Sequence, residues 1–135
     1  VISGHDPSIK MYEVSVNDYN WLGVCGLTDI DLYNRRAEFS LYIKPSDQRK
    51  GYAKKALKTL LAHGFMNLGL NTIWGETFDG NPAFKLFTKL GMTHRGTRVE
   101  FYYRNVKLFD AHLVSRCRST FDDISKNWAS LKVIK

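Results

Sequence analysis

The strongest constraint on how this chain folds comes from residues 48–53, Gln-Arg-Lys-Gly-Tyr-Ala, which separate two patterns of different period. Before them, residues 38–43 alternate between polar and apolar side chains, which predicts a β-strand. Pro45 ends this strand because proline has no N–H group for the ladder. After them, apolar residues recur at steps of three and four as far as Leu68, which predicts an amphipathic helix. The chain therefore passes from strand to helix through a short turn that contains Gly51.

This turn has the chemistry of a diphosphate site. The first N–H groups of a helix have no partner inside the helix, and the helix dipole places partial positive charge there. Gly51 lets a ligand approach the backbone closely. Basic side chains surround the same turn at Arg49, Lys50, Lys54 and Lys55. A Walker loop and a dinucleotide-binding turn are both excluded, because each requires glycines in a spacing that this segment lacks.

Four segments of the chain resemble the GNAT N-acetyltransferase superfamily. Gln48-x-x-Gly51-x-Ala53 resembles its acetyl-CoA loop, which reads Gln/Arg-x-x-Gly-x-Gly/Ala. Residues 34–38 are similar to the Arg-Ala-Glu lead-in to its fourth strand, and residues 81–92 to its Asn-Pro-…-Leu-Tyr-x-Lys-Leu-Gly-Phe helix. Residues 103–111 resemble the last hairpin of the branch that contains ribosomal-protein alanine and amino-sugar acetyltransferases. The resemblance extends from roughly the second strand to the last.

The resemblance implies an α/β (α+β) fold, with a mixed, mostly antiparallel sheet, a central parallel pair and a crossover helix. The sequence pattern predicts strands at 9–16, 21–32, 37–43 and 72–78, with a helix at 53–68. A second helix, capped by Asn81 with Pro82 at its first position, is expected to end at Gly91. A hairpin is expected at 97–103 and 107–116, and a short helix at 119–130. Val106 replaces the family's turn glycine, which leaves the turn type open.

A chain of 135 residues is expected to be a single acetyltransferase-like domain over residues 1–135. The family's domain normally starts with a strand and one or two helices ahead of the hairpin predicted at 9–32. We expect that N-terminal strand–helix unit to be missing or truncated. We expect a fragment, or a short form in which a second subunit of a homodimer or the C-terminal segment fills the gap.

Composition narrows the partners of the chain. No apolar run approaches the ~20 residues that a membrane helix requires, so no membrane partner is expected. Cys25 and Cys117 lack metal or redox spacing and are expected to be free thiols in a cytoplasmic protein. The net charge of +7 raises the alternative of a basic domain associated with RNA or DNA. The basic residues are scattered among acidic ones, which favours a solvated surface and a site for an anionic cofactor over a nucleic-acid partner.

The resemblance implies a site for acetyl-CoA. The family holds the pantetheine arm with backbone groups of its fourth strand, here Leu41, Tyr42 and Ile43, opposite the strand at 72–78. The diphosphate would lie on residues 48–54. We therefore expect the following residues in the loop and the second helix to bind the cofactor: Gln48, Arg49, Lys50, Gly51, Tyr52, Ala53, Lys54, Asn81, Phe84 and Phe87. Simpler structural roles exist for some, since Asn81 is a helix cap, Tyr52 a surface tyrosine, and the two phenylalanines core residues.

Two glutamates are candidates for the catalytic base. Glu38 matches the glutamate of the family's Arg-Ala-Glu segment, although a salt bridge to Arg35 or Arg36 is its structural alternative. Glu76 shares a strand face with apolar neighbours that can raise its pKa, although solvation or a salt bridge explains it equally well. Phe87 stands where the family often has a tyrosine that protonates the departing thiolate, so this position cannot donate a proton.

The histidines show no metal-ligand spacing, and no metal is expected. His112 lies in the last predicted strand with Asp110, where such pairs are usually structural. The sequence therefore predicts an acetyl-CoA-dependent N-acetyltransferase that transfers acetyl directly to a primary amine. The acceptor, a small molecule or a peptide, is a protein N-terminus, an amino sugar or another small metabolite. A CoA-binding module without catalysis and a basic nucleic-acid-associated domain are the alternatives.

Overall fold

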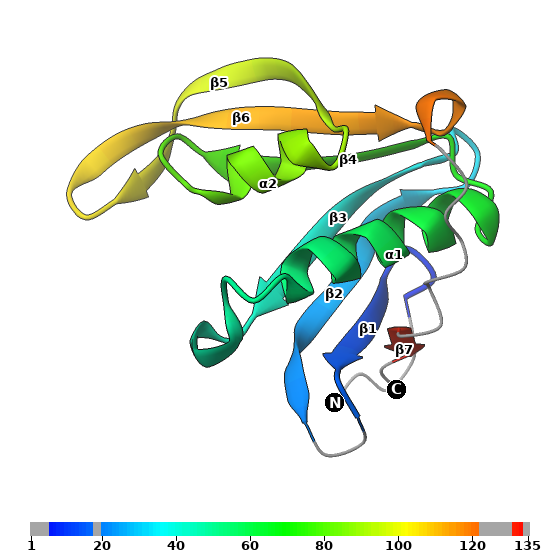
Figure 1. Ribbon diagram of the computed structural model, residues 1–135. Coiled ribbons are helices and arrows are strands. Elements are labelled where there is room, and N and C mark those ends of the chain that lie inside the picture. The colour runs from blue at the N-terminus through cyan, green and yellow to red at the C-terminus, as the bar shows by residue number, and fades with distance from the viewer. Residues whose placement is uncertain (1–5, 18–19, 122–130, 134–135) are drawn as a thin grey trace.

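The computed structural model describes residues 6–17, 20–121 and 131–133, and for the last three residues it describes the backbone only. Within this part of the chain, one sheet of seven strands has the order β5-β6-β4-β3-β2-β1-β7. Two α-helices and two short 3-10 helices complete the fold, and both α-helices lie on the same face of the sheet (Figure 1). The elements in chain order are β1 Lys10–Ser15, β2 Trp21–Asp31, β3 Arg36–Ile43, η1 Pro45–Asp47, α1 Tyr52–Met66, β4 Thr72–Phe78, α2 Ala83–Lys89, β5 Thr93–Arg104, β6 Lys107–Cys117, η2 Arg118–Thr120 and β7 Leu131–Val133.

The parallel pair at the centre of the sheet is short. β3 and β4 pair in parallel only from Arg36–Thr72 to Glu38–Trp74, and α1 connects them. All other strand pairs are antiparallel. Beyond Glu38 the two strands diverge, as Figure 1 shows on the left of the view. The predicted fold class, with a central parallel pair and a crossover helix, is confirmed.

The apolar stripe of α1 packs on the sheet as the spacing predicts. Fully buried side chains on α1 include Leu57, Leu60 and Phe65, and they meet Leu27 and Ile73 from the strands. Burying a side chain of this size stabilises a fold by about 1.5–3 kcal/mol. α1 is thereby fixed across β2, β3 and β4, which places its first turn beside the end of β3.

The predicted helix ends are close to the observed ones. Gly69 and Gly91 follow the two helices with φ of 70° and 84°, the left-handed conformation expected of glycine at a C-terminal cap. α1 ends at Met66, two positions before the predicted end, because the N–H groups of the next two residues both bond to the His63 carbonyl. α2 starts at Ala83 and not at Pro82, because the Asn81 Oδ1 atom accepts the Ala83 N–H at 2.9 Å.

The last hairpin is longer than predicted. β5 starts at Thr93, because His94 and Gly96 already pair with β6 on either side of an irregularity. At the turn, Asn105 and Val106 have φ of 52° and 60°, the signature of a type I′ turn. A valine in this conformation is strained, since its branched Cβ crowds the backbone.

The C-terminal prediction is only partly within the described residues. Most of the helix predicted at 119–130 lies outside them, and Arg118–Thr120 form the short helix η2. The pairing of β7 with β1 was not predicted. No helix in the described part is long and apolar enough to cross a membrane.

Candidate active site

The divergence of β3 and β4 leaves part of the β3 backbone open. Residues 39–43 pair with β2 on one edge, and no ladder partner faces their other edge within the described residues. Of the three residues predicted to hold the pantetheine arm, Ile43 is buried, Leu41 is half-buried and Tyr42 is exposed. Free backbone donors and acceptors along a strand edge suit an amide-containing arm, which is itself a chain of donors and acceptors.

Phe87 of α2 packs against Phe39 of β3, beside the opening between β3 and β4. Their rings meet edge to face with centroids 5.0 Å apart, and both side chains are buried. Gly75 of β4 faces the same ring, and an added Cβ there would collide with Phe39. Phe84 lies elsewhere, because its ring packs against His94 and His112 of the β5–β6 hairpin. The structure therefore places Phe87 against β3, while Phe84 packs against the hairpin.

The turn before α1 has the open amides that the sequence predicted. Gly51 is the N-cap of α1, with φ of 86° and no side chain capping the helix. Within the described residues, no protein acceptor bonds to the backbone N–H groups of residues 49–54. A Cβ built on Gly51 has no atom within 4 Å, so the space above the turn is free. Arg49 also has positive φ, 65°, which is uncommon for a residue other than glycine. These features fit a bound diphosphate.

The side chains of this turn divide between structural and cationic roles. The Gln48 Nε2 atom donates to the Ile43 carbonyl at 2.8 Å, which holds the turn against the end of β3. The Asp47 carboxylate lies 3.4 Å from the Lys44 ammonium and 3.5 Å from that of Lys50. Tyr52 and Ala53 are half-buried against the core, so their contribution to a ligand site is their backbone. Lys54 and Arg49 are exposed.

Glu38 lies on the sheet face opposite the helices, beside the point where β3 and β4 separate. Burial raises the pKa of this carboxyl, the negative charges of Asp29 and Glu76 raise it further, and the positive charge of Arg98 lowers it. Neither predicted arginine forms an ion pair with Glu38 in the described residues. Arg36 instead lies 3.6 Å from Asp31, and Arg35 points toward the Gly69 carbonyl. A carboxyl with a raised pKa and no cation bound to it suits a general base.

Glu76 is on the same face, and its side chain contacts two residues of β5. The Tyr102 hydroxyl donates to Glu76 Oε1 at 2.5 Å, and the Arg98 Nε atom lies 3.4 Å from Oε2. The Glu76 side chain is 11% exposed, whereas that of Arg98 is 46% exposed, and Oε2 is buried without a hydrogen-bond partner among the described residues. The salt-bridge alternative is therefore the observed environment of Glu76. Sequence reasoning missed Arg98, Tyr102 and Asp29, because none lies in a motif and their proximity depends on strand order.

A groove of about 600 Å³ opens on this face next to Glu38. Trp74, the registered partner of Glu38 on β4, forms one wall. The other residues lining it are Ser8, Asp29, Ile30, Asp31 and Arg36. With two aspartates at its rim and two glutamates nearby, this face of the sheet favours cationic ligands.

His112, which was predicted to pair with Asp110, contacts other residues. His112 Nε2 lies 2.9 Å from Asp79 Oδ1, and His112 Nδ1 lies 3.3 Å from His94 Nε2. Asp110 instead accepts the Glu100 N–H at 2.9 Å. The described residues contain no group of three or more potential ligands that could hold a metal ion.

A short parallel pair that separates beside an open helix N-terminus defines the class of acyltransferases that bind coenzyme A between two strands. Residues 4–93 match the family described as "Acetyltransferase (GNAT) domain", and the chain belongs to this family. Its members use acetyl-CoA as co-substrate. The branch suggested by the hairpin motif stays a prediction.

Several known proteins are similar to this chain. The spermidine N(1)-acetyltransferase of Vibrio cholerae serotype O1 is 30% identical over 107 residues, covering 78% of this chain and 62% of the relative. That of Escherichia coli K12 is 31% identical over 102 residues, covering 75% and 54%. An uncharacterized N-acetyltransferase, p20, of Bacillus licheniformis is 30% identical over 95 residues, covering 70% and 53%. The chain thus spans little more than half the length of these relatives.

Solved structures show the same fold. The dodecameric structure of spermidine N-acetyltransferase from Vibrio cholerae, in an intermediate state, superposes with a TM-score of 0.82 at 28% identity, over 85% of this chain and 68% of that one. The spermidine/spermine N-acetyltransferase from the same organism, in complex with manganese ions, has a TM-score of 0.81 at 28% identity, over 85% and 68%.

Proposed function

We propose that this chain binds acetyl-CoA and transfers the acetyl group to a primary amine. The observation that carries the proposal is the open first turn of α1, whose N–H groups have no protein acceptor among the described residues, beside a strand edge that has no ladder partner in the same part of the chain. Family membership supports the same activity. The diphosphate would lie on residues 49–54 and the pantetheine arm along residues 41–43.

Direct transfer requires few groups from the protein. The amine lone pair attacks the carbonyl carbon of the thioester, the C–N bond forms, the C–S bond breaks, and the nitrogen loses a proton. Glu38 takes this proton directly or through a water molecule. Backbone N–H groups on the open edge of β3 polarise the carbonyl oxygen of the thioester. Phe87 has no proton to donate, so the thiolate takes its proton from water.

For the acceptor, we propose a small amine that carries more than one cationic nitrogen. The names of the relatives support this choice, since two of them are spermidine N(1)-acetyltransferases. The rim of the groove supports it as well, because Asp29 attracts a second ammonium group, whereas Asp31 lies 3.6 Å from Arg36 in the same groove. A protein N-terminus or an amino sugar offers one ammonium and leaves part of this charge unmatched.

The test is an acetyl-transfer assay that detects free thiol, run with spermidine, an amino sugar and a peptide with a free N-terminus. Calorimetric titration with acetyl-CoA accompanies it. We expect micromolar acetyl-CoA binding and turnover that is fastest with spermidine. Turnover with the peptide or amino sugar alone would overturn the acceptor assignment. No acetyl-CoA binding would overturn the whole proposal.

A CoA-binding module without catalysis is the second candidate, and Phe87 favours it. This buried phenylalanine stands where relatives of the family often place a proton donor for the thiolate. Acetyl-CoA binding without turnover of any amine would support this alternative.

We also propose that the chain forms a homodimer in a cytoplasmic setting. The far end of the β5–β6 hairpin exposes large apolar side chains, with Val99 73%, Phe101 51%, Val106 84% and Leu108 57% exposed. Large exposed apolar side chains gathered on one hairpin often mark an interface between proteins. The cytoplasmic setting is supported by two free cysteines, and burial raises the pKa of the Cys25 thiol to about 12, which keeps it unreactive.

A further inference from the structure

β5 contains a bulge that places two side chains unusually close together. Arg98 pairs with Ala111 and Tyr102 pairs with Phe109, so four steps along β5 match two steps along β6. In a regular strand, residues four positions apart are about 13 Å apart, whereas two steps along β6 span about 7 Å. The bulge at residues 99–101 therefore brings Arg98 and Tyr102 to neighbouring positions on the same face.

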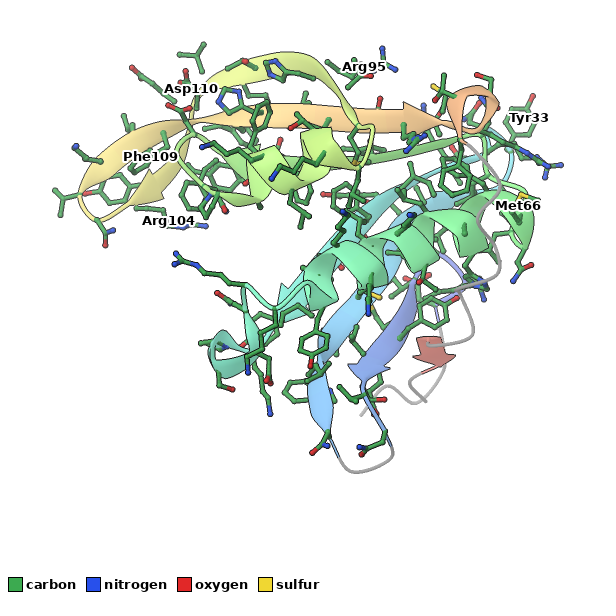
Figure 2. The ribbon with its side chains drawn as sticks, in the orientation of Figure 1. Tyr33, Met66, Arg95, Arg104, Phe109 and Asp110 are labelled. Carbon is green, nitrogen blue, oxygen red and sulfur yellow. The ribbon has the colours of Figure 1, made fainter. Side chains whose placement is uncertain are left out.

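The bulge is held by a specific contact. Glu100 has φ of 52°, and its N–H donates to Asp110 Oδ1 at 2.9 Å. Phe109 and Asp110 project from opposite sides of β6 (Figure 2). Asp110 is thus on the side away from Tyr102, where it stabilises the backbone that aims Tyr102. Bulges beside functional sites commonly direct a side chain in this way.

Arg98 and Tyr102 both contact Glu76. The Tyr102 hydroxyl lies 2.5 Å from Oε1, and the Arg98 Nε atom lies 3.4 Å from Oε2. Two neighbouring side chains pack on the Tyr102 ring. The centroid of the Phe78 ring lies 6.2 Å from the Tyr102 centroid, and the Arg104 guanidinium lies 5.2 Å from it. The bond to Glu76 is the largest cause that raises the pKa of Tyr102, to about 12, so the phenol stays protonated as a donor. The Glu76 carboxylate is thereby held through Oε1, while Oε2 has no hydrogen-bond partner among the described residues.

Glu76 is also the next residue on its face of β4 after Trp74, the last residue paired with β3. It therefore lies at the opening between the strands, within electrostatic range of Glu38. The charged groups that act on Glu38 are Asp29 from β2, Glu76 from β4 and Arg98 from β5. The two glutamates thus differ in environment: Glu38 has no bonded cation in the described residues, whereas Glu76 is oriented by a donor and a guanidinium.

We propose that Arg98 and Tyr102 are positioning residues, which hold the Glu76 carboxylate at the strand opening so that it orients the acceptor's ammonium group toward Glu38. This inference rests on the proposed function. The two carboxylates then have different roles: Glu76 binds the acceptor's ammonium group, and Glu38 takes the proton from its nitrogen. β5 does not border the opening between β3 and β4, but its side chains then determine the orientation of the acceptor's ammonium group.

The experiment compares pH–rate profiles of acetyl transfer to spermidine for the unaltered chain and four variants. The rate should rise with pH as Glu38 loses its proton, and this rise is the acidic limb of the profile. Arg98→Gln removes the charge that lowers the pKa of Glu38, so the acidic limb should move to higher pH. Glu76→Gln removes a charge that raises this pKa, so the limb should move to lower pH. Each shift should be on the order of one pH unit, since unit charges roughly 8 Å apart shift a pKa by about 1.5 units at an effective dielectric constant of 20 and by about 0.4 unit in water. A structural defect alone cannot move the limb in opposite directions for the two partners of one ion pair.

Tyr102→Phe should lower kcat/KM for spermidine roughly tenfold, the effect of losing one hydrogen bond to a charged group. Tyr103→Phe, the adjacent residue on the other face of β5, is the matched control and should match the unaltered chain. Acetyl-CoA affinity, measured by calorimetry, should be the same in every variant.

The possible results separate the inference from the proposed function. If the unaltered chain transferred no acetyl group, both would fall together. If it transferred acetyl and the Arg98 and Glu76 variants shifted the limb in the same direction, or Tyr102→Phe matched Tyr103→Phe, the inference alone would fall. Carbon-13 NMR titration of the Glu38 carboxyl gives the same two opposite shifts independently of turnover, and unchanged values would also overturn the inference.

Discussion

Replacement of Gly51 by glutamate tests the diphosphate site without a packing defect. Gly51 has φ of 86°, and no atom lies within 4 Å of a Cβ built there. A glutamate at this position therefore clashes with nothing, and its cost in free energy of unfolding is the left-handed backbone, about 1–2 kcal/mol. The new carboxylate would lie over the open N–H groups where we propose that the diphosphate binds.

The expected loss of affinity follows from charge repulsion. Two unit charges 4 Å apart repel by about 4 kcal/mol at an effective dielectric constant of 20. This energy corresponds to a roughly thousandfold increase in Kd for acetyl-CoA. Gly51→Ala carries the backbone strain without the charge and should weaken binding by less than about tenfold.

The matched control is Gly80→Glu, in the turn between β4 and α2. Gly80 has φ of 89° and likewise has no atom within 4 Å of its added Cβ, so the strain and the charge are the same. Calorimetry gives the Kd of each variant, and urea denaturation gives its free energy of unfolding. Both glutamate variants should lose similar stability, while only Gly51→Glu loses affinity. Equal affinities in the two variants would refute the assignment of the diphosphate to this turn.

Two further variants test the base and the hairpin turn. Glu38→Gln should lower kcat by at least about a hundredfold with acetyl-CoA affinity unchanged, and an unaltered pH–rate profile would exclude Glu38 as the base. Because the pKa of Glu38 is raised in the folded chain, the wild type should also lose a little stability as the pH rises from the unfolded pKa through the folded one, and Glu38→Gln should lack this loss in urea titrations at several pH values. Val106→Gly should raise the melting temperature, because glycine accepts the φ of 60° that strains valine, and should weaken self-association in sedimentation velocity if the exposed hairpin forms the dimer. A lower melting temperature would contradict the strain, and unchanged association would place the dimer contact elsewhere.

Local patterns predicted the elements well. The alternation at 38–43 and the three- and four-residue steps after Gly51 became β3 and α1, because side-chain period and backbone conformation are linked within a few residues. Gly69 and Gly91 ended the helices for an equally local reason. Of the two phenylalanines expected at the cofactor site, Phe87 lies against Phe39 of β3, beside the opening between β3 and β4. Phe84 does not, because a helical pattern does not specify which neighbour its residues meet.

The surroundings of the two candidate glutamates depended on strand order. Sequence reasoning named Glu38 and Glu76, but their neighbours Asp29, Arg98 and Tyr102 come from β2 and β5, which the chain reaches far from either glutamate. His112 likewise pairs with Asp79 from another strand's end, and not with Asp110 beside it in sequence.

The amino-acid sequence by itself determined the strand–turn–helix unit with its open amides, because periodicity, caps and glycine conformations act over a few residues. Only the tertiary structure decided how far β3 and β4 stay paired, and that a bulge in β5 aims Arg98 and Tyr102 at Glu76. These features depend on register between strands distant in sequence, and register is set by the packing of the whole sheet.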